Sequence, residues 1–289
     1  MKPAISIVMP AYNAGNYISE SIESILSQIF DDFELIIIDD GSTDNSVEIV
    51  NSYHDSRIVL LENPHDFILS LNTGIEISKG KYIARMDADD IMMPNRLQLQ
   101  YEFMESHPDV DISGGWMETF GNGKEIIQQP LSHNDILSIM LMHCPLYHPT
   151  VILRRDSISK LPSFPYIYKQ KFIYAEDYKL WTELAMAGLH FANIPEILLK
   201  YRLSETQNTS RFVSQMHDGS KHIQAEYLEY ISEKLVENDE KLFGFINRTI
   251  ELFNESILTF STLKQVICDI YRNQLKELRR KDKVKVLFS

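Results

Sequence analysis

Three aspartates lie within four positions of the segment YIARMDADDIMMP, residues 82–94, directly after an apolar run: Asp87, Asp89 and Asp90. Carboxylates this close repel one another, and each loses hydration where it is partly buried. A divalent cation offsets that cost, because Mg²⁺ and Mn²⁺ prefer oxygen ligands. Alternate residues of a strand point the same way, so the D-x-D spacing favours such a metal site. The alternative is a solvated acidic loop or a cluster at the start of a helix after Pro94.

Two other apolar runs also end in polar residues. Tyr12 and Asn13 follow ISIVMPA, and Asp39 and Asp40 follow FELIII. Together with the acidic segment, three separate stretches of sequence therefore end in polar residues, which is the first functional signal. Asp39 and Asp40 have a simpler alternative, which is to cap the turn and helix that follow at GSTDNS.

The hydrophobic pattern predicts the elements that position these groups. Leu and Ile are continuous at 35–38, which is typical of a strand buried on both faces of a parallel sheet. Asn16 is suited to cap one helix, and Gly80 and Gly188 are suited to end two others. In the first third, strands are predicted at 4–10, 33–40, 57–62 and 81–87, and helices at 16–30, 46–54, 66–80 and 94–107.

The rest of the chain has a mixed pattern that becomes helical from residue 213 onward. We therefore predict a domain over 1–212, with halves 1–107 and 108–212, and a helical region over 213–289. Between 108 and 212, strands are predicted at 110–120, 148–155 and 191–202, and helices at 133–143 and 176–188.

The alternating order predicts an α/β fold with a doubly wound, mostly parallel sheet, flanked by helices and followed by a helical extension. In such sheets ligands bind beyond the carboxyl ends of the strands. Three polar strand ends, after residues 11, 38 and 86, should therefore meet at one edge.

Composition limits the setting. The net charge of −13 argues against nucleic-acid binding, which needs clustered cations. Two cysteines cannot form a disulfide framework, and we expect a reducing, cytoplasmic location without a signal peptide or a spanning helix. A basic, partly apolar C-terminus, residues 279–288, predicts reversible contact with the anionic inner face of a membrane; a frayed, solvated end is the alternative.

Four segments together resemble the markers of family 2 glycosyltransferases with the GT-A fold: PAYN at 10–13, DDGSTD at 39–44, ARMDADD at 84–90 and AED at 175–177. Their order and spacing match over roughly residues 3 to 205, which is more specific than any single motif. The resemblance implies an inverting glycosyltransferase. It would move a hexose or N-acetylhexosamine from a UDP-sugar to a saccharide or lipid-linked saccharide in bacterial surface polysaccharide synthesis.

The resemblance also implies a donor site. Tyr12 would be the aromatic wall for the base, and Asp40 would accept a hydrogen bond from the uracil imide N–H. Asp87 would lie near the ribose. The other residues of the implied donor site are Pro10, Ala11, Asn13 and Ala88.

The implied chemistry is a single displacement assisted by Mn²⁺ or Mg²⁺. Asp89 would be the metal ligand, and Asp90 would help to hold the site. Asp177, preceded by Glu176, would be the general base, kept ionised by the metal and nearby cations. Without the other motifs, this acid pair would read as an ordinary helix start. Two residues are expected to support the site or contact the acceptor: His148 and Arg202.

The chain departs from the family pattern at two positions. Leu71 stands where members often carry an arginine, and Ser204 stands near the place of a histidine that approaches the metal. Two other functions remain open from the sequence. A nucleotidyltransferase would normally begin with a glycine-rich basic loop, which PAYNAGNY lacks. A non-catalytic nucleotide-sugar or glycan-binding module would be supported by loss of Asp89 or Asp177, and both are present.

Overall fold

The structure, a computed structural model, describes residues 2–204, 212–236, 249–250 and 259–287, without the side chains of 235–236 and 274–287. The first half is built on parallel strands in the order β3-β2-β1-β4. The chain moves outward from β1 to β3 and then returns to the other side of β1, so the direction reverses between β1 and β4. These strands are β1 (Ile5–Ala11), β2 (Phe33–Asp39), β3 (Ile58–Glu62) and β4 (Tyr82–Arg85).

The second half extends the same sheet from β4 in the order β8-β6-β9-β5, with β7 paired to β6. Here β8 runs antiparallel to both of its neighbours and β9 runs parallel to β6, so the whole sheet is mixed. The expected α/β class is confirmed, and except for β5 the strands that this part adds to the sheet belong to residues 108–212, where the sequence pattern was mixed. The strands are β5 (Ile91–Met92), β6 (Ile112–Gly121), β7 (Ile126–Ile127), β8 (Ile152–Arg154) and β9 (Phe191–Leu203).

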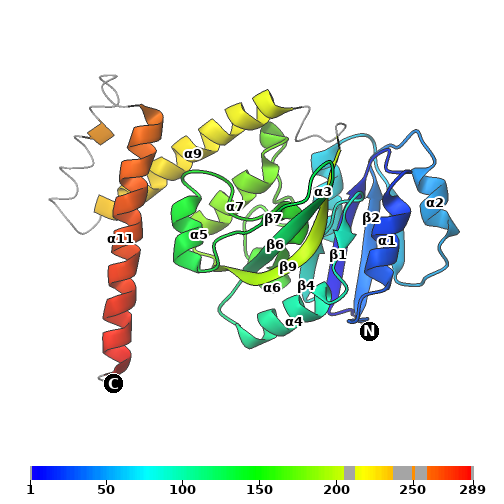
Figure 1. The fold of residues 1–289 in the computed structure, drawn as a ribbon, viewed down its shortest axis with the longest axis horizontal. Coiled ribbons are helices and arrows are strands. Elements are labelled where there is room, and N and C mark those ends of the chain that lie inside the picture. The colour runs from blue at the N-terminus through cyan, green and yellow to red at the C-terminus, as the bar shows by residue number, and fades with distance from the viewer. Residues whose placement is uncertain (1, 205–211, 237–248, 251–258, 288–289) are drawn as a thin grey trace.

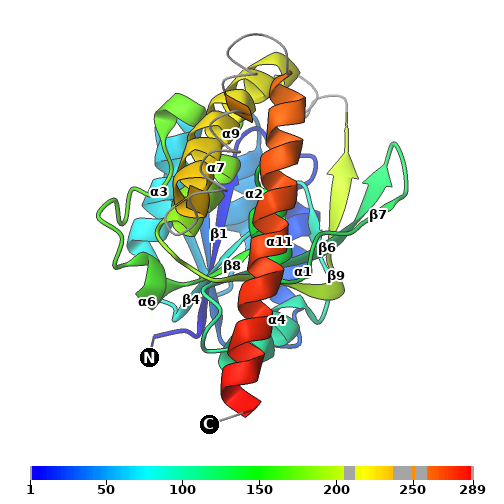
Figure 2. The ribbon, with the colours of Figure 1, turned by 90° about the vertical axis from the view of Figure 1, so that its left-hand side faces the viewer.

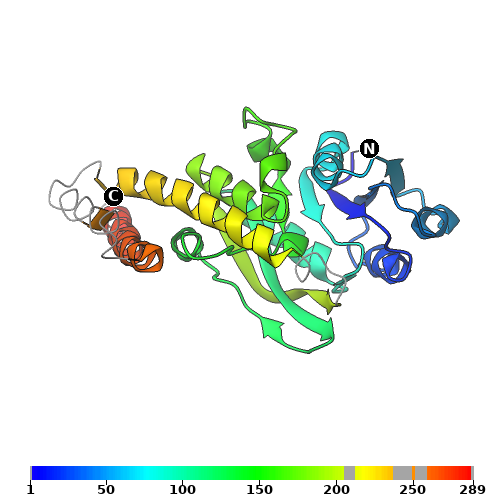
Figure 3. The same cartoon turned by 90° about the horizontal axis from the view of Figure 1, so that it is seen from above.

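Helices cover both faces of the sheet, as the view from above shows (Figure 3). Alternate residues of β1 and β2 enter two different hydrophobic clusters, so both strands are buried on both faces. One face is covered by α1 (Ile18–Leu26), α2 (Ser46–Ser52) and α4 (Arg96–Ser106). The other is covered by α3 (Phe67–Ile77), α5 (His133–Ile139) and α7 (Glu176–Met186). Short helices are η1 (His148–Thr150), α6 (Arg155–Ile158) and η2 (Gln170–Phe172).

The helical region contains α9 (Val213–Val236) and α11 (Phe260–Leu287). α11 lies at the end of the molecule far from α1 and α2, and α9 contacts α11 there and extends over α7 towards the middle of the molecule (Figures 1 and 2). Ile223 and Tyr227 of α9 and Ile267 of α11 belong to the same buried cluster as α5 and α7. The helical extension thus shares a core with the sheet, while the division of the chain at residue 212 stays a prediction.

The predicted caps have mixed outcomes. Gly188 follows α7 with a φ of +81°, a left-handed conformation that glycine adopts without strain, so this cap is confirmed. Asn16 was the wrong cap, because Tyr17 is the N-cap of α1 and makes no side-chain cap bond. Gly80 lies beyond the C-cap of α3. A Cβ there would lie 2.5 Å from the backbone nitrogen of Ser6, so this glycine permits a close backbone approach.

Candidate active site

A cleft of about 770 Å³ opens at the carboxyl ends of β1, β2 and β4, where the strand order reverses. This is the position at which open α/β sheets bind ligands. The cleft brings together residues from all four motif segments, including Tyr12, Asp40, Asp89 and Asp177. Other predicted residues that line it are Pro10, Ala11, Asn13, Asp87, Ala88, His148 and Glu176.

The loop after β2 is fixed against the loop after β1. Asp39 accepts hydrogen bonds from the backbone nitrogens of Gly41 and Ser42 at 3.2 and 3.0 Å, so for Asp39 the alternative of capping the following turn is confirmed. Asn13 adopts a φ of 48° and its Oδ1 accepts from the backbone nitrogen of Thr43 at 2.8 Å. Asn13 is therefore held by the turn as well as lining the cleft, which limits its freedom to contact a ligand.

Asp40 is buried at the end of β2, with only 2% of its surface exposed. Its Oδ1 accepts from the backbone nitrogen of Asp66 at 2.9 Å and from Ser70 Oγ at 2.7 Å. Its Oδ2 lies 3.1 Å from Nδ1 of His65, whose ring stacks on Tyr12 with the centroids 4.1 Å apart. The carboxylate and the tyrosine ring are therefore held by neighbours in one wall of the cleft.

The acidic segment satisfies the first requirement of a metal site. Asp87, Asp89 and Asp90 can each place a carboxylate oxygen within 4.8 Å of the others. Asp90 is fully buried, and its Oδ2 has no hydrogen-bond partner among the described residues. Burial, followed by the charges of Asp87 and Asp89, raises the pKa of Asp90 well above its usual value. An oxygen-only set with an unsatisfied buried carboxylate fits a hard divalent cation.

Arg202 of β9 supports the acidic segment, residues 87–90, through hydrogen bonds. Its Nε donates to the backbone carbonyl of Asp89 at 2.8 Å, and its backbone nitrogen donates to Asp90 Oδ1 at 2.9 Å. The guanidinium forms an ion pair with Glu20 of α1 and lies 4.4 Å from the ring centroids of Tyr17 and of Phe120. Of the two roles expected for Arg202, these contacts are those of a support for the acidic segment.

Arg85, the last residue of β4, was missed by the sequence reasoning. Its side chain is buried beside the acidic segment, where it forms an ion pair with Asp87, and its Nε has no partner among the described residues. Asp87 is thus partly neutralised by the protein itself. The positive charge of Arg85 also acts on Glu176 and Asp177, where it partly opposes the rise in pKa that burial causes.

Glu176 and Asp177 form the first turn of α7, and both face the cleft. Burial, followed by the charge of Asp177, raises the pKa of Glu176 to about 8, and Oε2 of Glu176 has no partner among the described residues. Burial also raises the pKa of Asp177, against the backbone N–H of Tyr178 and the charge of Arg85. Arg85 therefore acts on Asp177 in the direction that the sequence predicted, but burial has the larger effect on its pKa. That Asp177 is ionised at neutral pH stays a prediction.

Cys144 completes the surroundings of the acid pair. Its Sγ lies 3.8 Å from Asp177 Oδ2, within reach of a weak S–H hydrogen bond. Burial and the charge of Asp177 raise the pKa of Cys144 well above its usual value, so the thiol stays protonated and can act as a donor. No short sequence pattern joins residues 144 and 177, so this contact could not be predicted.

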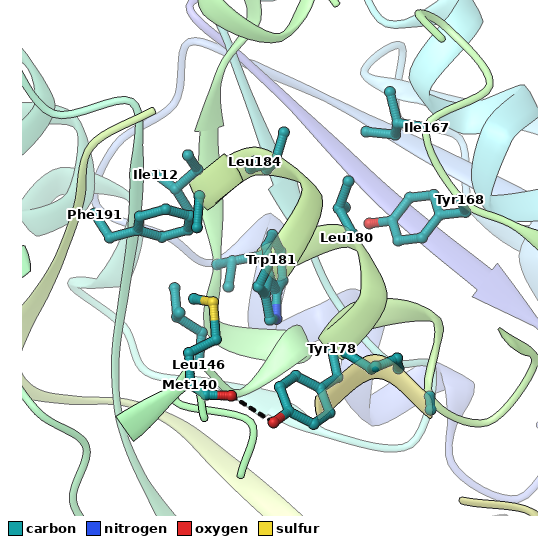
Figure 4. Packing of buried hydrophobic residues seen from close by; sticks show 14 of the residues in the cluster. Ile112, Met140, Leu146, Ile167, Tyr168, Tyr178, Leu180, Trp181, Leu184 and Phe191 are labelled. Atoms are coloured by element: carbon teal, nitrogen blue, oxygen red, sulfur yellow. Dashed lines mark hydrogen bonds between the residues drawn. The ribbon is translucent and has the colours of Figure 1, made fainter. Parts of the chain in front are cut away.

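His148 lines the cleft but is buried, and its Nε2 lies 2.8 Å from the hydroxyl of Tyr168. Burial and the charge of Arg85 lower its pKa well below the usual value, so it is a neutral hydrogen-bonding residue. Behind it, Trp181 is fully buried and belongs to the core (Figure 4). Tyr178 in the same view donates to the backbone carbonyl of Met140 at 2.5 Å, which ties α7 to the end of α5.

The two departures from the family pattern have different consequences. Leu71 lies on the buried face of α3 and does not line the cleft, so position 71 offers no phosphate contact. The neighbouring Asn72 instead exchanges hydrogen bonds with the backbone of Tyr168 at 3.1 and 2.9 Å. Ser204 lines the cleft. Other lining residues carry no motif: Met117, Tyr147, Tyr201, Leu203 and Met216.

Comparison with known proteins agrees with this geometry. The model of the family described as glycosyl transferase family 2 matches residues 6–161. A glycosyltransferase of Haemophilus influenzae is 35% identical over 248 residues, which cover 81% of this chain and 76% of that protein. WfgD of Escherichia coli, a UDP-Glc:α-D-GlcNAc-diphosphoundecaprenol β-1,3-glucosyltransferase, is 34% identical over 71% of this chain and 79% of its own length.

Solved structures share the fold. Staphylococcus aureus TarS 1–349 in complex with UDP-GlcNAc superposes with a TM-score of 0.65 at 18% identity, covering 97% of this chain and 92% of that one. At this identity the likeness concerns the fold alone. The motif segments meet in one cleft, and the family model and the relatives cover most of the chain that builds it. The chain belongs to glycosyl transferase family 2 and has the GT-A fold.

Proposed function

We propose that the protein is an inverting glycosyltransferase that moves a hexose or N-acetylhexosamine from a UDP-sugar to a hydroxyl group of a saccharide. One observation supports the proposal: Tyr12 with Asp40, the cluster of carboxylate oxygens at 87–90, and the buried carboxyl of Asp177 meet at the same cleft. Transfer from a nucleoside-diphosphate sugar requires one group of each kind. The first would bind the nucleobase, the second would bind the metal at the diphosphate, and the third would activate the hydroxyl that attacks the anomeric carbon.

The donor half would bind through Tyr12 and Asp40. The ring of Tyr12 offers a stacking surface, and Asp40 offers a buried anionic acceptor for an imide N–H. Uracil presents such an N–H between two carbonyls. UDP as the nucleotide is supported by the UDP-Glc named for WfgD and by the UDP-GlcNAc bound to TarS.

Mg²⁺ or Mn²⁺ bound by Asp89, with Asp90 beside it, would compensate the charge that grows on the leaving diphosphate. Arg85 would supply fixed positive charge beside the same region, because it is buried and paired with Asp87. Arg202 would keep the segment in place through its bonds to Asp89 and Asp90.

Asp177 would accept the proton of the attacking acceptor hydroxyl. Its raised pKa makes it a stronger base than an exposed aspartate, and the protonated neighbour Glu176 leaves the pair with one negative charge near neutral pH. Cys144 would donate to Asp177 and orient it. A single attack on the anomeric carbon inverts its configuration.

The acceptor is proposed to be a saccharide of bacterial surface polysaccharide synthesis, carried on a lipid. WfgD, with its lipid-linked acceptor, and AmsE of Erwinia amylovora, an amylovoran biosynthesis glycosyltransferase that is 33% identical over 205 residues, support this class. No helix in the described part of the chain is both long and apolar enough to cross a bilayer. We propose that the basic residues of 279–285, whose side chains lie outside the description, hold the enzyme reversibly at the membrane surface.

The experiment is donor hydrolysis across UDP-Glc, UDP-Gal, UDP-GlcNAc, UDP-GalNAc and GDP-Man, each with Mn²⁺, Mg²⁺ or excess EDTA. We expect one UDP-sugar to be hydrolysed in the presence of metal and none in EDTA. Asp89→Ala should reduce turnover by about 10²–10³-fold, because the diphosphate charge is left uncompensated. Asp109→Ala, which removes an exposed aspartate outside the cleft, is the control. Full activity in EDTA or activity with GDP-Man alone would contradict the proposal.

A further inference from the structure

His65 holds both groups through which the proposed donor base would bind. Its ring stacks on Tyr12, with an angle of 26° between the planes. Its Nδ1 lies 2.9 Å from the backbone carbonyl of Asp40 and 3.1 Å from Oδ2 of the same residue. A single side chain therefore touches the stacking wall and the anionic acceptor at once.

The position of His65 is set by the backbone. Gly41 adopts a φ of +80°, and a Cβ there would lie 3.2 Å from the backbone nitrogen of His65, so the two loops pack closely. The next residue, Asp66, donates its backbone N–H to Asp40 Oδ1 and caps α3 by accepting from Leu69. The side chain of His65 is 62% exposed. Its backbone position is nevertheless restrained, because the adjacent Asp66 is hydrogen-bonded to Asp40 and caps α3.

The contacts leave Asp40 with one open acceptor site. A carboxylate has about four lone-pair sites. Asp66 and Ser70 take the two of Oδ1, whereas His65 Nδ1 has one position for a proton and lies 2.9 Å from the backbone carbonyl of Asp40 and 3.1 Å from Oδ2. Oδ2 is therefore the one oxygen of the Asp40 carboxylate left to accept from the imide N–H of a base.

His65 also lies on the side of Tyr12 and Asp40 that faces away from the cleft. Tyr12 and Asp40 line both the catalytic cleft and a smaller cavity of about 400 Å³, whereas His65 lines the smaller cavity and not the cleft. With the ring centroids 4.1 Å apart, no base can enter between Tyr12 and His65. The face of Tyr12 that is left for a base is the one directed to the cleft. Tyr12 is 48% exposed, so without this backing its ring would have greater rotational freedom.

We propose that His65 is a positioning residue for nucleotide recognition: it backs Tyr12 and orients Asp40, so that a stacking face and one acceptor site are preset toward the cleft. This proposal rests on the proposed function for the existence of a base at Tyr12 and Asp40. It predicts that His65 affects binding of the base and leaves the diphosphate and the chemistry unchanged.

The test measures UDP binding with Mn²⁺ by calorimetry, and KM and kcat for donor hydrolysis. We expect His65→Ala to weaken UDP binding about tenfold or more and to raise KM similarly, with kcat within about twofold. His65→Phe keeps the ring, and His65→Asn keeps an N–H near the place of Nδ1, so each should recover part of the loss. Inorganic pyrophosphate with Mn²⁺ should bind the wild type and all three variants equally, because it lacks a base. His54→Ala, which removes an exposed histidine outside the cleft, is the matched control.

UDP binding to His65→Ala that is as tight as, or tighter than, wild-type binding would overturn the proposal, since the imidazole would then be an obstacle to the base. An equal loss of pyrophosphate affinity would also overturn it, because the effect would then be a general distortion of the site. If the wild type binds GDP and not UDP, the donor assignment fails. The same series with GDP then decides the role of His65 separately. A wild type that binds neither nucleotide contradicts both.

Discussion

At the scale of single residues, burial rather than charge pairing sets the protonation of the acid pair. Glu176 and Asp177 are both buried, and Arg85 offsets only part of the desolvation. A pKa of about 8 for Glu176 means that this carboxyl is mostly protonated at neutral pH. Asp177 can then hold the negative charge that a general base needs.

This protonation has a measurable effect on stability. The pKa of Glu176 rises from 4.5 to about 8 on folding, so the folded state binds the proton more tightly than the unfolded state. The contribution of Glu176 is therefore favourable below pH 4.5 and is lost as the pH rises toward 8. Glu176→Gln keeps the shape of the neutral side chain and does not ionise. In thermal unfolding, the stability of this variant relative to the wild type should therefore increase as the pH rises from 5 to 8.5.

The control for this experiment is Glu125→Gln, which removes an exposed carboxylate. Its stability difference from the wild type should change little over the same pH range. If Glu176→Gln followed the wild type with an unchanged difference, the buried carboxyl would be ionised throughout and the assigned protonation would be wrong.

Residue types that cluster in the sequence were predictable, and residues that meet through the fold were not. Asp87, Asp89 and Asp90 are recognisable from the sequence because they lie within four positions, and each is found in the cleft or beside it. Cys144 reaches Asp177 only because α7 packs over the segment before η1. His65 is in no motif, and its contact with Tyr12 depends on how two loops after different strands pack together.

At the scale of elements, the site depends on β9 as much as on the parallel strands. The strand carries Arg202 against the acidic segment, where the guanidinium reaches Glu20 of α1 and the carbonyl of Asp89. The pattern located β9 correctly, but pairing with β5 and β6 is a long-range property that periodicity does not encode. The parallel strands of the first half were easier to predict from the sequence, because continuous apolar runs indicate strands that are covered on both faces.

Removing this support should weaken the metal site without removing a proposed ligand. We expect Arg202→Ala to raise the Mn²⁺ concentration for half-maximal activity by about 10–100-fold, which is usual for residues that orient metal ligands. Arg202→Lys should recover little, because lysine has no planar fork to reach two partners. Arg57→Ala breaks an ion pair with Asp55 outside the cleft and should leave the metal requirement unchanged. An unchanged requirement in Arg202→Ala would show that β9 does not hold the acidic segment.

At the scale of the whole molecule, the catalytic cleft and the end of α11 lie in different parts of the fold. The C-terminal part of α11 extends past the rest of the ribbon (Figure 1), and the basic cluster of residues 279–285 belongs to that part. In a chain of net charge −13, such a tail would favour one orientation at an anionic surface. Composition predicted this asymmetry, and the helical region predicted over 213–289 included the tail, which α11 continues to Leu287.

The prediction concerns co-sedimentation with liposomes that contain anionic lipid. The full chain should bind, binding should weaken as salt rises, and five substitutions to glutamine at Arg279, Arg280, Lys281, Lys283 and Lys285 should abolish it. Glutamine at five exposed lysines elsewhere, Lys2, Lys79, Lys124, Lys160 and Lys171, controls for the change in net charge. Equal sedimentation of the wild type and the five-substitution variant would rule out the tail as the contact.

The measurement that tests the central claim most directly is the effect of Asp177→Asn on turnover and on UDP binding in the same preparation. The amide keeps the shape of the side chain but cannot accept a proton from the acceptor. We predict that kcat for transfer falls by about 10²–10⁴-fold while the Kd for UDP with Mn²⁺ stays within about threefold of the wild type. A variant that keeps wild-type turnover, or that loses UDP binding as severely as turnover, would contradict the assignment of this cleft as a glycosyl-transfer site with Asp177 as its base.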